Sequence, residues 1–208
     1  MSSQSLNFNL CDSQPLLVVI SGPSGVGKDA ILLELKQRTL PLYFVVNATT
    51  RSRRADEREG IDYFFVSVER FQQMIAQGEL IEYALVYEDY KGIPKAQIQA
   101  AMESGKDVVL RVDVQGAARI RSICPGAVLI FILPTDEEEW LKRLMERKTE
   151  TAESLKLRIA TAAEELKRVP EFDYTVVNSH GRIKETVDTI LSIIEAEHHR
   201  VNRRKVTL

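Results

Sequence analysis

Gly22-Pro23-Ser24-Gly25-Val26-Gly27-Lys28-Asp29 is the stretch that decides the fold of this chain. An apolar run at 16–20, typical of a buried parallel strand, precedes it, and a helical pattern at 30–35 follows. This order is typical of a P-loop, whose amides cradle nucleotide phosphates at the positive end of a helix while the lysine reaches the β and γ phosphates. The glycines let the backbone approach the anion closely. An ordinary strand-to-helix turn is the alternative, but it would not need the lysine.

Position 29 departs from the P-loop pattern, in which a Ser or Thr hydroxyl ligates Mg²⁺. Asp29 offers a carboxylate instead, and carboxylates are also good Mg²⁺ ligands. It brings a negative charge close to the phosphates, however. At about 5 Å and an effective dielectric of about 20, the repulsion is on the order of 3 kcal/mol unless a metal lies between the charges. The substitution therefore indicates either a variant metal site or a loss of catalysis.

Composition limits the classes of protein to which the chain can belong. Its 208 residues are 44% hydrophobic and 28% charged with a net charge of -2, which is typical of one domain with a full core. This charge favours neither nucleic acid nor a membrane surface, and no apolar run has the length of a membrane span. Cys11 and Cys124 lie far apart, as expected in a reducing cytosol. We therefore expect a cytoplasmic protein without a nucleic-acid, membrane or obligate protein partner.

The two ends of the chain differ from its middle. Residues 1–15 are polar and have neither the basic residues nor the apolar segment of a targeting sequence, so we expect a flexible N-terminal extension. Residues 198–208 form a basic C-terminal tail. A solvated end is the favoured interpretation of this tail, and an arm that binds nucleic acid is the alternative.

Strand-like and helical segments alternate along the middle of the chain. Apolar runs predict strands at 16–20, 43–46, 108–112, 128–133 and 174–177. Between them lie helical stripes, of which two end at Gly78 and Gly105 and one begins at a Thr135/Glu138 capping box, with Met145 in its buried stripe. The alternation predicts an α/β fold with a parallel sheet covered by helices on both faces.

Two regions interrupt this alternation. Short strand-like pieces surround one helix at about 48–91, which predicts an inserted lobe. A polar, charged segment at 147–153 joins two helices and predicts a mobile flap within a lid at about 143–158. The remaining core then comprises about 16–47 and 92–197.

Three arginines in four residues, Arg51, Arg53 and Arg54, lie in the expected lobe, and Tyr63 follows them. Such clusters are usually solvated. Opposite a P-loop, however, their planar guanidinium groups suit bidentate binding of a second phosphate. Both interpretations stay open on spacing alone.

Glu82 lies within an apolar strand-like run, where a buried carboxylate is costly unless it is paired. A base with two adjacent N–H donors, as guanine has at N1 and N2, would pair it. A strand edge with Glu82 facing water is the alternative.

Asp113 ends an apolar strand, the position at which P-loop enzymes hold Mg²⁺ or its waters. Three further arginines are spaced across the expected lid: Arg143, Arg147 and Arg158. They would neutralise charge that develops during phosphoryl transfer. The alternative is that they form surface ion pairs.

Taken together, these motifs resemble guanylate kinase from about residue 16 to 197. The motifs that carry the resemblance, in family order, are Thr49-Thr50-Arg51 with Arg54, Gly60-x-Asp62-Tyr63-x-Phe65-Val66, Ile81-Glu82-Tyr83, Asp113-Val114-Gln115-Gly116, Phe131-Ile132-Leu133-Pro134 and Arg147-x-Thr149-Glu150-Thr151. The resemblance implies a P-loop nucleoside monophosphate kinase fold with a GMP-binding lobe and a lid. It also implies ATP-dependent phosphorylation of GMP, and of dGMP, in purine nucleotide metabolism.

The resemblance also implies roles for single residues. ATP is expected at Gly22, Pro23, Ser24, Gly25, Val26, Gly27, Lys28 and Asp29. GMP is expected at Asn47, Arg51, Arg54, Tyr63, Glu82, Lys91, Gly92 and Asp113. The expected catalytic residues are Lys28, Arg143, Arg147 and Arg158, and the expected Mg²⁺ ligands are Asp29 and Asp113.

Besides Asp29, four residues depart from the family pattern. Asn47 replaces a serine near guanine O6, Lys91 replaces a phosphate-binding tyrosine, Ile93 replaces a Ser or Thr that helps to read O6, and Arg111 replaces an acidic residue. The Gly-Lys-Asp sequence together with Tyr-Lys-Gly-Ile-Pro resembles the plastid and cyanobacterial branch.

Two rival functions differ from this one in a feature of the sequence. A guanylate-kinase-like module that binds phosphorylated peptides resembles the family, but such modules usually have an eroded P-loop and come with SH3 and PDZ domains. A kinase for AMP or UMP would need a base pocket without Glu82. The intact Lys28, Asp113 and arginine set favours the enzyme.

Overall fold

The computed structural model describes residues 14–55, 57–86, 88–145 and 152–207. Its larger sheet has five strands in the order β2-β7-β1-β8-β9, and every neighbouring pair is parallel. The strands are β1 (Leu17–Ser21), β2 (Leu42–Phe44), β7 (Asp107–Arg111), β8 (Val128–Leu133) and β9 (Tyr174–Val177). All five predicted strands are present, with shifts of one or two residues at their ends, and the predicted parallel sheet is confirmed.

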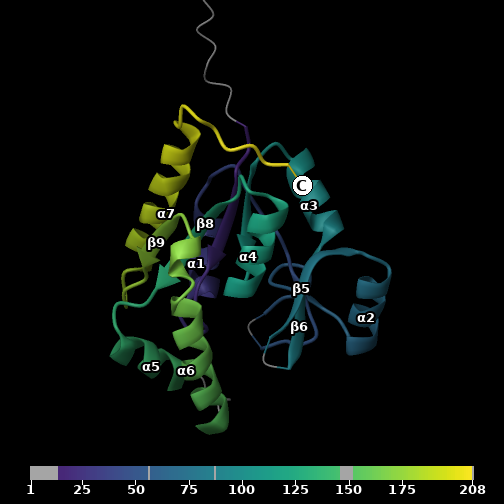
Figure 1. Ribbon diagram of the computed structural model, residues 1–208, viewed down its shortest axis with the longest axis vertical. Helices are drawn as coiled ribbons and strands as arrows, with labels where there is room; N and C mark the ends of the chain where they lie inside the picture. Colours follow the sequence, from purple (N-terminus) through teal and green to yellow (C-terminus); the bar gives the residue numbers. More distant parts are fainter. Residues whose placement is uncertain (1–13, 56, 87, 146–151, 208) are drawn as a thin grey trace, which may run out of the picture.

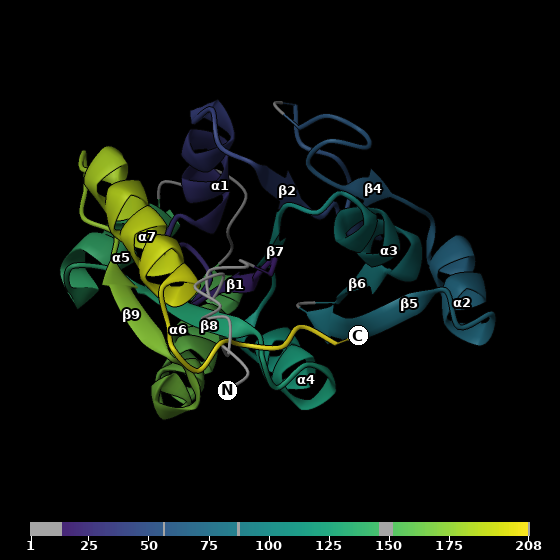
Figure 2. The same ribbon diagram turned by 90° about the horizontal axis from the view of Figure 1, so that it is seen from above.

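Helices cover both faces of this sheet, as Figures 1 and 2 show. Not all helices of the described chain take part in this covering. In chain order, they are α1 (Lys28–Gln37), α2 (Val68–Ala76), α3 (Lys95–Glu103), α4 (Val114–Ile123), α5 (Glu137–Met145), α6 (Ala152–Leu166) and α7 (Ile183–His198). α1 and α7 pack on one face, while α3 and α4 contribute to the core on the other. A 3-10 turn at Val169–Glu171 leads from α6 into β9.

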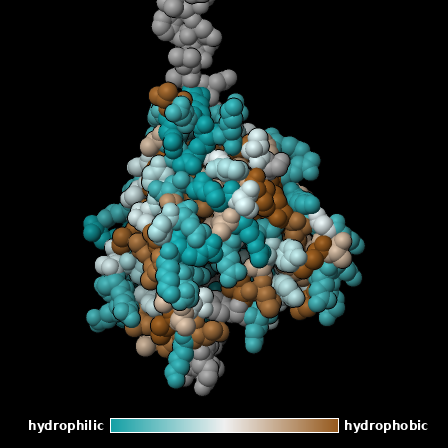
Figure 3. Space-filling model, in the orientation of Figure 1, coloured by the Kyte–Doolittle hydropathy of each residue, from teal (hydrophilic) through white to brown (hydrophobic). Residues whose placement is uncertain are grey.

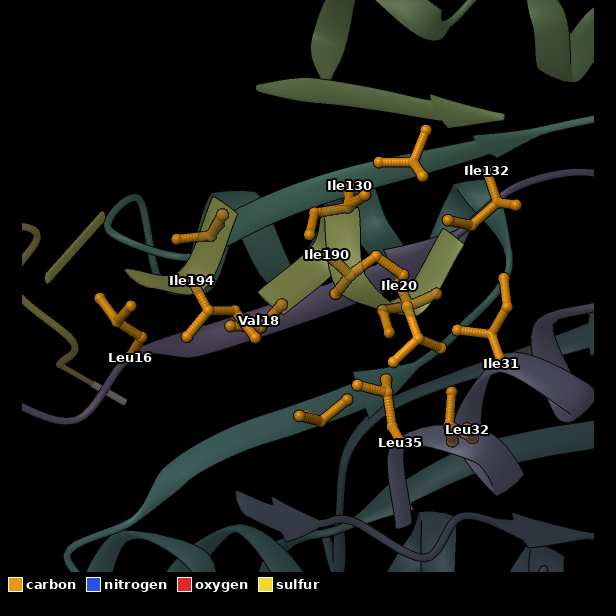
Figure 4. Packing of buried hydrophobic residues seen from close by; sticks show 14 of the residues in the cluster. Leu16, Val18, Ile20, Ile31, Leu32, Leu35, Ile130, Ile132, Ile190 and Ile194 are labelled. Carbon is orange, nitrogen blue, oxygen red and sulfur yellow. The ribbon is translucent and has the colours of Figure 1, made fainter. Parts of the chain in front are cut away.

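The central strand β1 is buried on both faces. Val18 and Ile20 pack with α1 and α7, and Figure 4 shows Val18 near Ile194 of α7 and Ile20 between Ile190 of α7 and Ile31 of α1. Leu17 and Val19 belong to the cluster on the opposite face. Because each buried aliphatic side chain contributes about 1.5–3 kcal/mol, this double burial anchors the loop that follows β1.

A second sheet lies beside the first (Figure 2) and has the order β4-β3-β6-β5. Its strands are β3 (Ala48–Thr49), β4 (Phe64–Phe65), β5 (Leu80–Val86) and β6 (Asp89–Pro94). Helix α2 packs on it through Phe71, whose ring stacks on Tyr90 with the centroids 5.2 Å apart. The lobe, lid and tail boundaries given above stay predictions.

The predicted helix ends hold in two cases and shift in a third. Gly78 and Gly105, with φ of 65° and 64°, follow α2 and α3 as expected. The Thr135/Glu138 capping box is wrong by one residue, because Asp136 accepts the capping hydrogen bond from the Glu139 amide at 2.8 Å.

Helix α5 also differs from the prediction in its buried stripe. Met145 is 63% exposed, whereas Trp140 and Leu144 are buried. Leu157 of α6 is exposed as well. Figure 3 shows hydrophobic atoms gathered at the lower end of the molecule, over these two helices. Along the part of the chain described above, no helix is long and apolar enough to cross a membrane.

Most residues of the basic C-terminal tail are exposed, as expected of a solvated end, but the Arg204 side chain is largely buried. Arg204 forms ion pairs with Glu197 and Asp173, at 2.8 and 3.2 Å. Burial by itself would raise the pKa of Glu197, but hydrogen bonds from Arg204 and Tyr174 outweigh it and lower that pKa to about 2. The chain then runs from α7 across the molecule towards α3 (Figure 2).

Candidate active site

A cavity of about 350 Å³ lies where the carboxyl ends of β1 and β7 face the second sheet. In parallel α/β sheets, ligands bind at this edge. The cavity brings together residues from the phosphate loop and from the second sheet. Of the expected site residues, its lining includes Gly22, Ser24, Gly25, Gly27, Lys28, Asp29, Asn47, Arg51, Arg54, Tyr63, Glu82, Lys91, Gly92, Asp113 and Arg158.

Backbone geometry shows why glycines occur in the phosphate loop. Gly22, Gly25 and Gly27 have φ of 140°, 84° and 98°, a conformation that other residues rarely adopt. A Cβ at Gly22 would lie 2.5 Å from the carbonyl oxygen of Ile132. The loop therefore sits against β8 at a distance that only glycine permits.

Side chains from outside the loop fix its carbonyl groups. Trp140 Nε1 donates to the Ser24 carbonyl at 2.8 Å, and Asn178 Nδ2 donates to the Val26 carbonyl at 2.8 Å. Arg143 donates to the same Val26 carbonyl at 3.2 Å and to the Asn178 carbonyl at 2.9 Å, and it pairs with Glu139. Arg143 is absent from the described cavity lining, so in this structure it braces the loop.

The Lys28 ammonium folds back onto the loop. It donates to the carbonyl oxygens of Gly22 and Pro23, the latter at 3.0 Å. Burial lowers the pKa of Lys28 to about 8, against the opposing charges of Glu165 and Asp29. A phosphate group in the cavity would offer this buried cation a stronger partner than two carbonyl groups.

Asp29 and Arg111, both departures from the family pattern, contact each other. Arg111 Nη1 pairs with Asp29 Oδ1, and Nη2 donates to the Asp62 carbonyl at 3.2 Å. The guanidinium also lies over the Tyr63 ring, 4.4 Å from its centroid. Burial would lower the pKa of Arg111, but the Asp29 carboxylate outweighs it and raises that pKa. The negative charge that Asp29 adds is thus already compensated within the protein.

Asp113 has a structural role as well as a place in the cavity. It is the N-cap of α4, and its Oδ1 accepts from the Gly116 amide at 2.8 Å. In the described part of the chain, no group of three or more His, Cys, Asp or Glu residues could by itself hold a metal ion. That is compatible with Mg²⁺ in a kinase, which takes one or two carboxylates, substrate phosphates and waters. Asp29 and Asp113 both line the cavity and fit such a partial site.

Two arginines of the cluster pair with one carboxylate. Arg51 Nη2 lies 2.6 Å from Glu57 Oε1, and Arg54 Nη1 lies 3.9 Å from the same oxygen. Burial would raise the pKa of Glu57, but hydrogen bonds from Arg51 and Arg54 lower it. Arg51 also lies over the Tyr63 ring, 5.6 Å from its centroid. Arg53 donates to the Glu57 carbonyl and is not in the described lining.

Glu82 is buried, so the alternative in which it faces water is wrong. Its side chain is 5% exposed, and its Oε1 lies 2.9 Å from Nη1 of Arg119, which is 49% exposed. Burial and the Asp113 charge raise the pKa of Glu82 to about 7, against the attraction of Arg119. Glu82 is therefore a buried carboxylate that pairs with Arg119 of α4.

The other departures have distinct environments. Asn47 donates through Nδ2 to the Arg111 carbonyl at 2.7 Å, while its buried Oδ1 has no hydrogen-bond partner. The amide oxygen of Asn47, which lines the cavity, is thus an acceptor that no described donor satisfies. Burial lowers the pKa of Lys91. Ile93 is fully buried in the core and does not line the described cavity.

Arg158 reaches the phosphate loop, where its Nη1 donates to Ser24 Oγ at 2.5 Å. Glu165, on the same helix α6, lines the cavity, and its buried Oε2 has no hydrogen-bond partner. Burial raises the pKa of Glu165 to about 7, although the nearby Lys28 charge opposes this shift. Arg147 and most of the expected flap lie outside the described residues.

Three residues at or near the site were not predicted from the sequence: Arg119, Glu165 and Asn178. Arg119 and Glu165 lie on helices in patterns that look solvated, so spacing gives no sign that they approach the cavity. Asn178 directly follows β9, and a polar residue at the carboxyl end of a predicted parallel strand was a usable signal.

Comparison with known proteins gives a consistent result. A family model described as guanylate kinase matches residues 14–197. Guanylate kinase 2, chloroplastic/mitochondrial, of Oryza sativa subsp. japonica is 52% identical over 196 residues, which cover 94% of this chain and 69% of the relative. Guanylate kinase of Clostridioides difficile (strain 630) is 42% identical over 190 residues, covering 91% of this chain and 92% of the relative.

A solved structure shares the fold. The crystal structure of guanylate kinase from Anaplasma phagocytophilum superposes with a TM-score of 0.72 at 30% sequence identity. The match covers 92% of this chain and 90% of that chain.

Proposed function

Because this chain belongs to the guanylate kinase family, we propose that its cavity binds ATP at the phosphate loop and GMP against the second sheet. The protein is an ATP:GMP phosphotransferase that converts GMP to GDP. The observation that carries the assignment of sites is the single cavity that joins the loop to Arg51, Tyr63 and Glu82.

On the donor side, the backbone and Lys28 bind the ATP phosphates. The loop amides are fixed by the contacts to Ser24 and Val26 and need little reorganisation. When ATP binds, Lys28 leaves the two loop carbonyls and pairs with the phosphates. The buried ammonium then has a charged partner in place of two neutral ones. Positioning and charge neutralisation supply most of the catalysis in phosphoryl transfer.

On the acceptor side, the GMP phosphate takes the place of Glu57 between the arginines. Arg51 and Arg54 already converge on one carboxylate, which is an anion with oxygen spacing similar to that of a phosphate. Tyr63 lines the same part of the cavity, and burial raises the pKa of its hydroxyl, so it stays a neutral donor. The buried ammonium of Lys91 adds positive charge.

At the base, Glu82 accepts from guanine N1 and N2. Its burial makes an unpaired carboxylate costly, so a base without these donors is rejected. Asn47 Oδ1, the buried acceptor without a partner, adds a second acceptor to this region of the cavity.

Mg²⁺ accompanies ATP in this proposal, with Asp29 and Asp113 as the residues that would hold it or its waters. The metal supplies neutralisation of phosphate charge. Asp29 is 55% exposed and pairs with Arg111, while Asp113 is fixed at the start of α4.

The segment at about 143–158 is proposed to act as a lid. Arg158 already contacts Ser24 of the phosphate loop, so α6 brings a positive charge to the donor side. Closure of such a lid excludes water, which would otherwise hydrolyse the donor. Arg147 is proposed for the same role from the sequence alone.

We also propose a cytoplasmic location, use of dGMP as a second acceptor, and membership of the plastid and cyanobacterial branch. The 52% identity to a rice protein whose printed name is chloroplastic/mitochondrial supports the branch, while the bacterial relatives support the location. Fractionation of native cells with an antibody to the protein tests the location.

ADP formation with each monophosphate in turn tests the proposed function. Purified protein is assayed with ATP, Mg²⁺ and GMP, dGMP, AMP or UMP. We expect turnover with GMP and dGMP and almost none with AMP or UMP. Equal turnover with AMP would overturn the assignment of the base pocket, and binding of phosphopeptides without turnover would favour an interaction module.

A further inference from the structure

We propose that Arg111 is a phosphate-binding residue between the two nucleotide sites, and that Asp29 holds it in place before the substrates arrive. This inference rests on the proposed function, because it assigns a further residue to the same cavity. The family pattern gives no phosphate-binding role to this position, where an acidic residue is usual.

Arg111 lies at the carboxyl edge of the five-stranded sheet, next to the phosphate loop. It is the last residue of β7 and pairs in register with Ile20 of β1, directly before the phosphate loop. It also lines the cavity. Its backbone is therefore fixed by the buried sheet, and its side chain starts from the sheet edge at which the phosphates are expected.

The Arg111 guanidinium contacts residues on both sides of the cavity. It pairs with Asp29 on the donor side, while on the acceptor side it donates to the Asp62 carbonyl and lies over the Tyr63 ring. One planar cation thus contacts both walls of the cavity. The phosphoryl group must pass between these walls.

The charge of the Arg111 guanidinium is balanced by Asp29. The Arg111 side chain is 12% exposed, and a buried guanidinium needs a counter-charge. Asp29 supplies that charge from a side chain that is 55% exposed. A phosphate between the two nucleotides would carry more negative charge than one carboxylate and would match the guanidinium fork, so it would compete well for Arg111.

A purely structural bridge between β7 and the second sheet is the competing explanation. It predicts that loss of Arg111 lowers the melting temperature and leaves the affinity for phosphates unchanged. Our proposal predicts a specific loss of affinity for phosphate groups. The two explanations therefore differ in a binding measurement.

The test is calorimetric titration, in EDTA, with adenosine and guanosine joined 5′ to 5′ by five phosphates. Guanosine, which has no phosphate, is the matched ligand. Arg111→Gln is expected to weaken binding of the joined nucleotide about 100-fold, in line with the loss of one well-placed phosphate or oxyanion donor. It is expected to leave guanosine binding unchanged. Unchanged affinity for the joined nucleotide would overturn the proposal.

Two further variants keep the test decisive if Arg111→Gln does not fold. Arg111→Lys keeps the charge and loses the fork, so we expect an intermediate affinity; a wild-type affinity would count against the proposal. Asp29→Asn removes the carboxylate with which a phosphate competes for Arg111, so we expect tighter binding of the joined nucleotide without metal. Unchanged or weaker binding in Asp29→Asn would overturn the role of Asp29 as the counter-charge that the phosphate displaces.

Arg70→Gln is the control, because Arg70 of α2 forms an exposed ion pair with Glu79, and neither residue is in the described cavity lining. It is expected to match wild type with both ligands. Wild type that does not phosphorylate GMP would refute the proposed function. Wild type that does, together with an unaffected Arg111→Gln, would refute only the inference about Arg111.

Discussion

The phosphate loop and the second sheet face the same cavity but are held in different ways. The loop is fixed by glycine conformation, close packing on Ile132 and hydrogen bonds to its carbonyls from Trp140 and Asn178. The side chains of the second sheet are fixed by ion pairs, Arg51 with Glu57 and Glu82 with Arg119. The backbone thus holds the donor side in place, whereas the acceptor side is held by ion pairs that a substrate can replace.

This difference has a consequence for the two substrates. ATP meets amides that are already in place, so its binding requires little rearrangement beyond Lys28. GMP has to displace internal partners, because Glu57 occupies the arginines and Arg119 occupies Glu82. We therefore expect substitutions on the acceptor side to change selectivity and KM for GMP much more than they change ATP binding.

The largest expected effect concerns base choice. Adenine has an acceptor at N1 and no N2 amine, so AMP would leave the buried Glu82 unpaired. Wild type is expected to prefer GMP over AMP by about 10⁴-fold in kcat/KM. Glu82→Ala should remove most of this preference by weakening GMP, while the KM for ATP stays near wild type. Steady-state assays with both monophosphates measure it.

Comparable kcat/KM for AMP and GMP in wild type would break the comparison, because Glu82 would then not read the base. A Glu82→Ala protein with weaker ATP binding would show that the two sides are not separable.

A second, smaller effect is expected at Arg51. Arg51→Ala should raise the KM for GMP about 100-fold, because a bidentate phosphate contact is lost, and ATP binding should change little. Titration with guanosine supplies the control, since a ligand without phosphate should bind the variant and wild type almost equally. An unchanged KM for GMP would return the arginine cluster to a solvated face that pairs only with Glu57.

On the donor side, substitution of Asp29 tests whether the loop backbone is enough to bind ATP with Mg²⁺ or whether the carboxylate also contributes. If its carboxylate meets Mg²⁺ directly or through water, Asp29→Asn should lower both the apparent Mg²⁺ affinity and kcat, each about tenfold, as expected for an altered carboxylate near a metal. Asp29→Ser should retain activity. The measurement is the rate against free Mg²⁺ at saturating ATP and GMP. A variant Asp29→Asn that equals wild type at every Mg²⁺ level would exclude the metal role.

The smallest effect is expected at Arg119, and it depends on pH. Glu82 must be ionised to accept from guanine, and its pKa is about 7, so kcat/KM for GMP should fall as pH drops through about 7. Arg119→Gln removes an opposing positive charge and should raise the pKa of Glu82. The ratio of variant to wild-type kcat/KM should then be several-fold below one at pH 6.5 and return to one at pH 8.5.

Arg119 is half exposed, so screening by solvent keeps this effect modest. A ratio that does not change with pH would show that Arg119 acts on packing and not on the charge of Glu82.

The sequence was sufficient to predict the parallel sheet because its strands are long apolar runs that are buried on both faces, such as Val128–Leu133. It was also sufficient for the phosphate loop, whose glycines and lysine depend on local backbone geometry. The cap of α5 was missed by one residue, because Thr135 and Asp136 are both good caps and their order along the chain does not decide between them.

The pairings of the site were much harder to foresee. Asp29 and Arg111 are 82 positions apart, and their contact depends on the register of β1 against β7. Arg119 reaches Glu82 because α4 packs against β5, which no periodicity in either segment indicates. Residue types could be assigned a chemistry from the sequence, whereas their partners required the tertiary arrangement.

The ion pairs that the buried Glu197 forms near the C-terminus also matter to anyone who engineers this chain. The Glu197 side chain is fully buried, and Arg204, itself 13% exposed, is one of its two arginine partners. Removing one partner of a buried ion pair typically costs about 3–5 kcal/mol. Shortening the chain before Arg204 would therefore threaten the helix that packs on α1, far from any nucleotide. An affinity tag is therefore better placed elsewhere than next to Arg204, because it could disturb the ion pair with Glu197.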